Sequence, residues 1–488
     1  MRVRDLALGV AFSVVAPVTT VYAFCGFYVG GAGRELYSDA TMVVLMRDGR
    51  HTVLAMRNDY AGPPEDFAMV VPVPHVLGEE DVKTLPREVF DKIEELSAPR
   101  LVEYWEEEPF CAPPGTMMGW GTGGGFGMSG VGGMVRVEAQ FAVGEYDIVI
   151  LGADDSSALE TWLRREGYAI PADAAALLRP YIEAGTKFFV AKVDVSRLAF
   201  DNGAARLSPL RIHYEDDELR LPVRLGLANS PGRQDLLVHV LAADRYETAN
   251  YPNVFIPTNV VVRNYVKRRF AGFYASLFDR TLEQNPGSVV TEYAWSAGSC
   301  DPCPGPTLDA TDVLTLGGDV VPSAPSPWAL TLTRLHYRYD AGALGDDLVF
   351  RVAQPVQGGT GTPDERGNLV QGVREAQTNT FQARYAVLHR HWPPAPCAGN
   401  RIHRGWGGPS DGRAERTLPA LDTAKVRARR PGDLERMIRR PIPEIGLVPR
   451  NPGEARRPAR TELVPRALPY AASGARAVGR ACTSARRC

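Results

Sequence analysis

The feature that most constrains the fold is a set of strand patterns that do not alternate regularly with helices. Apolar residues take every second position in Met134–Val143, and apolar runs of strand length fill Thr41–Arg47, His51–Arg57 and Phe67–Val73. A doubly wound parallel sheet needs regular βαβ alternation, so we do not expect one. The patterns predict an α+β fold with a body of mostly antiparallel β-sheet and a few amphipathic helices.

The connections between strands are also predictable in part. Asp48-Gly49 suits the turn of a hairpin between the first two runs. Leu221–Leu227 and Leu236–Leu241 predict a second hairpin. In Leu330–Tyr339 the apolar phase slips, which predicts a β-bulge near Thr333. Apolar residues at helical spacing predict three helices, over 87–96, 157–167 and 266–278.

The layout of the chain follows from these patterns and from composition. We expect two α+β halves, residues 24–200 and 207–409, on either side of the turn Asp201-Asn202-Gly203. Residues 115–133 contain ten glycines and predict a flexible surface loop. Residues 410–488 hold one aromatic residue, Tyr470, and predict a disordered basic C-terminal tail.

The N-terminus predicts export. Residues 1–23 combine a short basic start, the apolar stretch Leu6–Val21 and, in Val21-Tyr22-Ala23, small or tolerated residues at the two positions that a signal peptidase reads. This pattern is typical of a signal peptide cleaved after Ala23, with an uncleaved anchor as the alternative. We therefore expect the protein in the periplasm, at the cell surface or outside the cell.

The net charge of −2 hides an asymmetry. Residues 411–488 hold 17 Arg and 1 Lys against 8 Asp or Glu, a net charge of +10, so the rest carries −12. Charge alone does not indicate nucleic-acid binding by either part, but the tail could contact anionic surfaces. An Arg-, Ala- and Pro-rich tail is also what a shifted reading frame in GC-rich DNA would encode.

Export favours disulfide bonds, so the cysteines of the body are disulfide candidates. They are Cys25, Cys111, Cys300, Cys303 and Cys397, and we expect Cys25 to pair with Cys111 or Cys397. Cys300-Asp301-Pro302-Cys303 has the spacing of a dithiol redox motif. The acidic Asp301 and the prolines that follow work against a low thiol pKa. We therefore prefer a structural disulfide loop to a catalytic pair.

Two further groups of residues are candidate sites. The first is a possible metal set on a histidine-rich segment, although its spacing fits no standard zinc finger; its members are His389, His391, Cys397 and His403. The second is a proline-rich acidic loop that could hold a cation or a polar ligand; its polar members are Asp59, Tyr60, Glu65 and Asp66. The simpler interpretations are surface histidines and a rigid turn.

Several motifs together resemble a bacterial exported family catalogued as domain of unknown function 2330. They begin with Phe24-Cys25-Gly26-Phe27-Tyr28 and the segments 40–47, 58–60 and 62–74, and continue far downstream in Thr291–Trp295 and Cys300–Pro306. The resemblance covers residues 24–408. It implies an envelope or secreted location, and it implies no reaction, ligand or fold.

No complete catalytic constellation or cofactor motif is present in the sequence. The glycine-rich run at 125–130 matches a dinucleotide fingerprint only on paper, because it does not follow a strand and open a helix. We therefore expect a non-enzymatic exported protein without a cofactor, which binds a partner or contributes to envelope structure. The alternative is a thiol–disulfide redox protein that uses Cys300 and Cys303.

Overall fold

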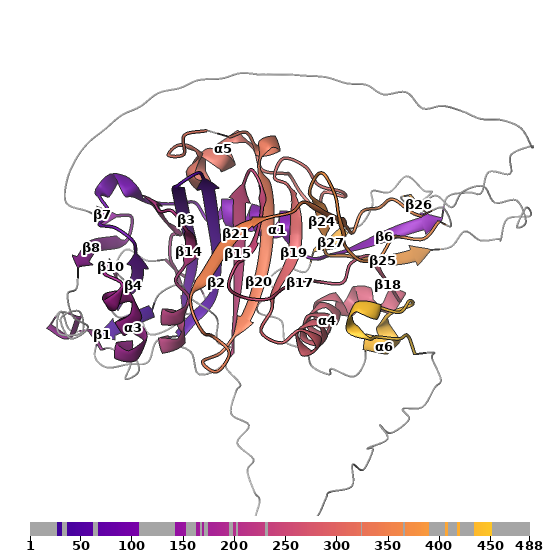
Figure 1. Cartoon of the computed structure of the whole chain (residues 1–488), viewed down its shortest axis with the longest axis horizontal. Coiled ribbons are helices and arrows are strands. Elements are labelled where there is room, and N and C mark those ends of the chain that lie inside the picture. The colour runs from indigo at the N-terminus through magenta and orange to yellow at the C-terminus, as the bar shows by residue number, and fades with distance from the viewer. Residues whose placement is uncertain are drawn as a thin grey trace, which may run out of the picture. The chain divides into compact units, whose positions relative to one another are not determined.

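A large mixed sheet forms the centre of the fold, because apolar strands from most of the chain pair in it (Figure 1). The computed structural model describes residues 27–31, 37–61, 67–106, 142–152, 163–165, 168–169, 174–194, 199–201, 204–229, 233–323, 325–364, 367–389, 406–407, 417–419 and 434–450. The chain divides into two units, Met1–Pro449 and Arg450–Cys488. Apart from Arg450, everything described below lies in the first unit.

Ten of the described strands follow one another across the central sheet. In spatial order they are β11 (Ala199–Asp201), β12 (Ala204–Arg206), β3 (His51–Ala61), β2 (Tyr37–Asp48), β15 (Gln234–Ala242), β20 (Thr331–Tyr339), β19 (Val289–Ser296), β24 (Thr380–Gln382), β22 (Val356–Gly358) and β23 (Arg374–Glu375). Three more strands attach to this path: β13 (Leu210–Glu215), β5 (Val82–Thr84) and β17 (Asn253–Phe255). Most pairs are antiparallel, while β2 and β15 run parallel.

Three smaller sheets lie beside it. The first contains β7 (Ala142–Val143), β8 (Tyr146–Gly152), β10 (Lys187–Val193), β4 (Phe67–Val73), β1 (Phe27–Gly31) and β9 (Tyr168–Ala169). The second contains β14 (Leu219–Leu221), β21 (Leu348–Ala353) and β16 (Arg245–Thr248). The third contains β18 (Val260–Val262), β25 (Arg384–His389), β6 (Arg100–Glu106), β26 (Trp406–Gly407) and β27 (Thr417–Pro419).

The helices are few, as expected. Among the described residues they include α1 (Glu88–Ser97), α3 (Ala174–Glu183), α4 (Phe270–Gln284), α5 (Ala310–Val313) and α6 (Leu434–Met437). A 3₁₀ helix, Asn264–Arg269, leads into α4. No helix among the described residues has the length and apolar character needed to cross a membrane. The α+β fold class is confirmed.

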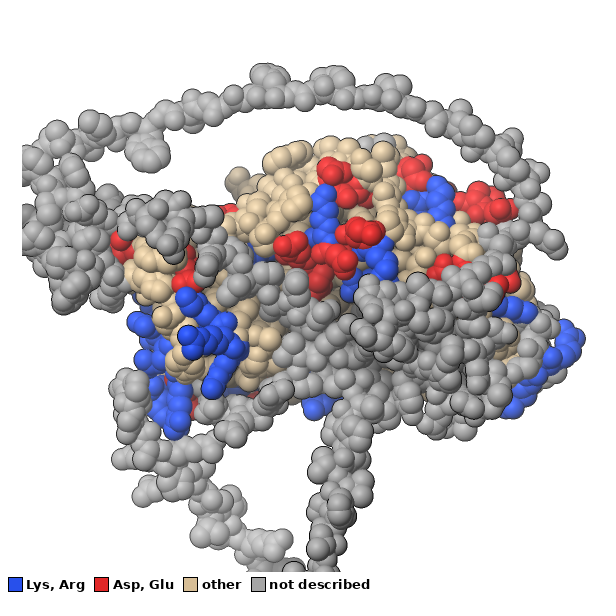
Figure 2. All heavy atoms as spheres, turned by 180° about the vertical axis from the view of Figure 1, so that it is seen from behind, with Lys and Arg blue, Asp and Glu red and all other residues tan. Residues whose placement is uncertain are grey.

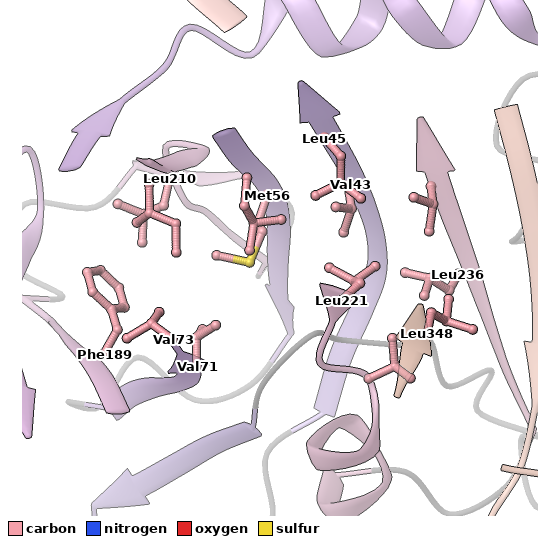
Figure 3. Close-up of a cluster of buried hydrophobic side chains, with 14 of the residues drawn as sticks. Val43, Leu45, Met56, Val71, Val73, Phe189, Leu210, Leu221, Leu236 and Leu348 are labelled. Atoms are coloured by element: carbon pink, nitrogen blue, oxygen red, sulfur yellow. The ribbon is translucent and has the colours of Figure 1, made fainter. Parts of the chain in front are cut away.

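Both faces of the central sheet are buried. On one face, side chains of β2, β3 and β15 meet those of β4, β10 and β14 in a large apolar core; its labelled members in Figure 3 are Val43, Leu45, Met56, Val71, Val73, Phe189, Leu210, Leu221, Leu236 and Leu348. On the other face, α1 packs Val89, Phe90 and Ile93 against alternate residues of β2. Within Thr41–Arg47, residues 42–46 are continuously apolar because β2 is covered on both sides.

Several local predictions are confirmed. The hairpin of β2 and β3 turns at Gly49, whose φ of 57° suits glycine in a tight turn. The strand Phe67–Val73 has the predicted ends. Helices at 87–96 and 266–278 correspond to α1 and α4, although α4 begins at Phe270.

The second predicted hairpin is wrong. β14 ends at Leu221 and pairs with β21, and a 3₁₀ helix, Arg224–Asn229, follows it. Pro222 cannot donate a backbone hydrogen bond to a ladder, which explains why the apolar run does not continue as a strand. β15 instead pairs with β2 and β20.

The predicted bulge near Thr333 is also wrong, because β20 pairs with β15 without interruption. The irregularity lies in the partner strand β19, where Thr291 faces Leu335 and Tyr293 faces Arg334. Glu292 is therefore the extra residue. The apolar phase of β20 slips because the strand is buried on both faces, with Leu332 on one face and Leu335 on the other.

One part of the predicted tail needs correction. Residues 434–450 are folded, and five of their apolar side chains join the core around α4; these are Leu434, Ile438, Ile442, Ile445 and Leu447. The tail is poor in aromatics, but this stretch has enough aliphatic side chains to repay its ordering. β27 pairs with β6 within the same predicted tail.

Other predictions fall on residues that the structure does not describe. These are the signal peptide, residues 1–23, the glycine-rich loop, residues 115–133, and most of the strand Met134–Val143, of which only β7 is described. Of the predicted helix at 157–167, only residues 163–165 are described, and they are helical. The predicted boundary near residues 200–207 falls within the central sheet, on β11 and β12 and ahead of β13.

Candidate functional site

A network of charged side chains lies inside the protein, between the central sheet and two helices. Most of its members come from β15, β19 and β20, and the covering helices α1 and α4 add Glu94 and Asp279. On β20 the even-numbered residues Arg334, His336 and Arg338 share one face. The side chains of all three are buried. Charged side chains are rarely buried unless they are paired.

Arg334 joins α1 to the sheet. Its Nε donates to Glu292 Oε2 at 2.6 Å, and its Nη1 donates to Glu94 Oε2 at 2.7 Å. Burial alone would lower the pKa of Arg334, but the two carboxylates outweigh it and raise that pKa. The bulge in β19 places Glu292 where it reaches both Arg334 and the next even residue of β20.

His336 lies between two carboxylates. Its Nδ1 is 2.8 Å from Glu292 Oε1, and its Nε2 is 3.1 Å from Asp235 Oδ1. Burial opposes the imidazolium, yet the two carboxylates raise the pKa of His336. Burial would likewise raise the pKa of Glu292, but His336 and Arg334 lower it to about 2. His336 is therefore a buried cation, and both of its nitrogens donate.

Helix α4 completes the network at its other end. Arg338 Nε donates to Asp235 Oδ1 at 2.6 Å, and its Nη1 donates to Asp279 of α4. The ring of Phe278 stacks on His336 with centroids 4.0 Å apart. Tyr274 donates its hydroxyl hydrogen to Glu292. Each carboxylate of the sheet thus has at least two donors.

His239 differs from His336. Its Nε2 lies 3.1 Å from Ser97 Oγ and 3.4 Å from Arg334 Nη1. Burial lowers the pKa of His239 well below its ordinary value, and Arg334 adds to this effect. His239 is therefore neutral. Ser97 and His239 do not form a nucleophile and base, because the Ser97 hydroxyl donates to Ile93 O at 2.7 Å.

The chemistry open to this network is limited by burial. The side chains of Arg334, Glu292 and Asp235 are 0% exposed, and that of His336 is 1% exposed. A substrate cannot touch these atoms while α1 and α4 stay in place. The network stabilises the packing of the helices on the sheet, and its charges balance one another.

The second candidate is the loop Cys300-Asp301-Pro302-Cys303, which a disulfide between its two cysteines closes. Cys300 is half-buried, and Cys303 is exposed. A disulfide between these two candidate cysteines is thus present in the fold. Polar contacts anchor the loop to the body largely through the backbone carbonyls of Asp301 and Pro302.

Two buried arginines hold this loop. Arg100 Nη1 donates to Pro302 O at 2.8 Å. Arg384 Nη2 donates to Asp301 O, and it also lies 3.1 Å from Asp301 Oδ2. Gln382 donates to the same carbonyl, Asp301 O. The loop therefore supplies acceptors for guanidinium groups that have no exposure to water.

The positive charge below the loop is only partly compensated. Burial lowers the pKa of Arg100 to about 10, and the nearby cations Arg384 and Arg334 also lower it. Asp301 is the acid that pairs with Arg384, and its side chain is half exposed. The carbonyl dipoles of the loop are thus part of what makes these buried charges tolerable.

Of the predicted metal set, the structure describes only His389. His389 Nε2 lies 2.8 Å from Glu103 Oε2, and its ring stacks on Trp105. The other members lie outside the described residues; these are His391, Cys397 and His403. Among the residues that are described, no three His, Cys, Asp or Glu side chains are placed to hold a metal ion.

The remaining predicted site residues are only partly covered. Asp59 and Tyr60 belong to strand β3, where they face Arg206 and Ala205 of β12, and not to a loop. Glu65 and Asp66 lie outside the described residues, as do the disulfide candidates Cys25 and Cys111.

Sequence reasoning missed the charge network. The signal was the alternation Arg334-Leu335-His336-Tyr337-Arg338, in which every polar position carries a cationic or titratable side chain. The same pattern would fit a strand whose polar face is exposed to solvent, where these cations would need no acidic partners. The acids that balance it are up to 240 residues away in the sequence, and only the fold brings them together.

Comparison with known proteins places the chain in a family. No curated protein and no solved structure is significantly similar to it. The family model for domain of unknown function 2330 matches residues 19–351, which include the disulfide loop and all strands of the charge network. The chain belongs to this family, which is described as an uncharacterized protein conserved in bacteria.

Proposed function

We propose that this protein is exported and acts outside the cytoplasm as a non-enzymatic binding or envelope-structural protein. The observation that carries the proposal is that the acid, histidine and arginine groups a catalytic site would need are paired with one another inside the core. The signal-peptide pattern of residues 1–23 and the Cys300–Cys303 disulfide support export, because disulfides persist in oxidising compartments.

Export is tested by cell fractionation and N-terminal sequencing of the protein made in a bacterial host. We expect the mature chain to begin at Phe24 and to be found outside the cytoplasm. A chain that keeps residues 1–23 and fractionates with the cytoplasm would contradict the proposal. A variant with Leu8→Arg and Val14→Arg, which interrupts the apolar stretch, is the matched control and should stay inside.

A second candidate function is thiol–disulfide exchange, and one observation favours it. Arg100 and Arg384 place two cations against the loop between the cysteines, and cations stabilise thiolates. A thiolate of an external dithiol would attack Cys303 Sγ, and Cys300 would leave as a thiolate and take a proton. The second thiolate of the reductant would then release Cys303, so that the dithiol is oxidised and the protein reduced by two electrons.

Thiol mass spectrometry after equilibration with a series of mild dithiol buffers separates the two functions. For a structural loop, Cys300–Cys303 stays oxidised until the protein unfolds. Reversible reduction in the folded protein, with turnover of a disulfide substrate that a Cys300→Ser/Cys303→Ser variant lacks, would establish the redox function instead.

A further inference from the structure

A surface rich in arginine lies where the chain near its C-terminal end docks beside α4. Arg268 and Arg269 end the 3₁₀ helix before α4, while Arg436 and Arg439 belong to α6 and the residue pair after it. All four are exposed. We call these four residues the basic face.

The fold holds the two segments of the basic face together. Arg263 N donates to Met437 O at 2.8 Å, and Arg439 N donates to Val261 O at 2.8 Å. Between these bonds, Val262 and Ile438 form a β-bridge. Val266, Leu434 and Ile438 point into the core, so their arginine neighbours face solvent. The four charges are therefore fixed to a folded scaffold.

These charges lack acidic partners in the part of the chain that the structure describes. The neighbouring Lys267 shows the contrast, because its Nζ lies 2.8 Å from Glu103 Oε2. Arginines elsewhere also have carboxylate partners, as Arg211 has Asp319 and Arg338 has Asp235. Among the described residues, no such ion pair involves any member of the basic face.

An aromatic side chain lies within the same surface. Tyr265 is 45% exposed, and its hydroxyl donates to Arg436 O at 2.8 Å. A partly exposed tyrosine among arginines suits the headgroup region of a membrane, where aromatic rings and basic side chains are enriched. Figure 1 draws α4 and α6 right of centre, so they lie on the left in Figure 2, which is seen from behind. Basic side chains gather at the lower left of Figure 2.

We propose that the basic face docks on an anionic phospholipid surface. Guanidinium groups bind phosphate oxygens in pairs, and each basic residue close to an anionic bilayer strengthens binding. The choice of a lipid over a nucleic acid rests on the proposed export. The contact is peripheral: the charges and Tyr265 lie at the headgroups, and the core behind them stays packed.

The test measures co-sedimentation of the full-length protein with vesicles of phosphatidylglycerol and phosphatidylcholine at low and at high salt. We expect binding to the mixed vesicles, little binding to pure phosphatidylcholine, and weaker binding at high salt. Arg268→Glu/Arg439→Glu should weaken binding at least about 25-fold, at about fivefold for each basic side chain lost.

Arg179→Glu/Arg233→Glu is the matched control, because both residues are exposed and the net charge changes equally. It should bind much more tightly than the test variant. Arg269→Gln/Arg436→Gln repeats the test with smaller changes, and thermal unfolding verifies that each variant is folded. Equal loss in test and control variants would overturn the proposal, as would wild-type protein that binds single-stranded DNA but not the vesicles. A negative result in the vesicle experiment does not change the result of the export experiment, so failure of one proposal can be distinguished from failure of the other.

Discussion

The charge of His336 follows from its two hydrogen bonds. A neutral imidazole has one N–H, but both nitrogens of His336 face carboxylates that only accept. With His336 protonated, three buried cations meet three buried carboxylates; the set is Arg334, His336, Arg338, Glu94, Asp235 and Glu292. Loss of the His336 proton would leave one buried negative charge without compensation.

This charge predicts a pH dependence of stability. Because the pKa of His336 is raised on folding above about 6.5, its contribution is complete below that pH. The contribution then falls by about 1.4 kcal/mol per pH unit until the folded pKa is passed. In urea unfolding from pH 5 to 9, the wild type should lose its advantage over His336→Gln as the pH rises.

His75→Gln changes an exposed histidine in the same way and is the control; it should unfold like the wild type throughout this range. A difference between wild type and His336→Gln that stays constant from pH 5 to 9 would show that His336 is neutral in the folded protein.

Arg334 is the residue whose removal should cost most. Arg334→Met leaves the buried carboxylates of Glu94 and Glu292 without their shared partner, and breaking such a pair costs about 3–5 kcal/mol. Arg220→Met removes an exposed arginine that pairs with exposed Glu218, and it should cost less than about 1 kcal/mol. Urea denaturation of both variants measures the two costs, and similar values would refute the buried network as a source of stability.

At the scale of single elements, the sequence predicts correctly those helices, strands and turns that local patterns determine. β4 and the hairpin of β2 and β3 are right because alternation, apolar runs and a glycine turn are local signals. The strand predicted to continue after Leu221 is wrong because that prediction used apolar content alone. Apolar content does not account for Pro222, which lacks the N–H that a strand donates to its partner. The bulge was placed on the wrong strand, since a phase slip in β20 has the same appearance whether a bulge or burial on both faces causes it.

The disulfide loop carries a prediction at this scale. Cys300→Ser/Cys303→Ser should lower the free energy of unfolding by about 2 kcal/mol, because the closed ring is small and its closure entropy is limited. Denaturant unfolding of wild type and variant under oxidising conditions measures this difference. With excess reductant in both samples the difference should vanish; a difference that persists would trace to the serines and not to the disulfide.

At the scale of the molecule, long-range pairing decides what the sequence could not. β2 pairs in parallel with β15, almost two hundred residues further along the chain, so residues on both sides of 200–207 share one sheet. The surroundings of the disulfide loop also depend on long-range pairing. Cys300 and Cys303 can be found in the sequence, but the sequence does not show that Arg100 and Arg384 are their neighbours. Periodicity reports the face of a residue and does not report its partner.

The folded stretch 434–450 bears on whether the C-terminal region belongs to the protein. Its backbone pairs with β18 through Val262 and Ile438, and its aliphatic side chains cover α4. A segment translated in a shifted frame has no reason to supply five buried apolar side chains at the positions where a helix needs them. Up to Pro449, the fold thus favours the native frame.

Two truncations test this conclusion. Ending the chain after residue 433 removes five buried aliphatic side chains, each worth roughly 1.5–3 kcal/mol of burial, a sum comparable to the whole stability of a typical domain. We expect that variant to be insoluble or to lose cooperative unfolding. Ending the chain after Pro449 keeps this core and should preserve the melting temperature, measured by circular dichroism.

Ile438→Ala is a milder test of the same core and should lower the free energy of unfolding by about 2–5 kcal/mol. If both truncated chains melt alike, residues 434–449 contribute nothing to the fold, and the shifted frame becomes the better explanation of the whole C-terminal region.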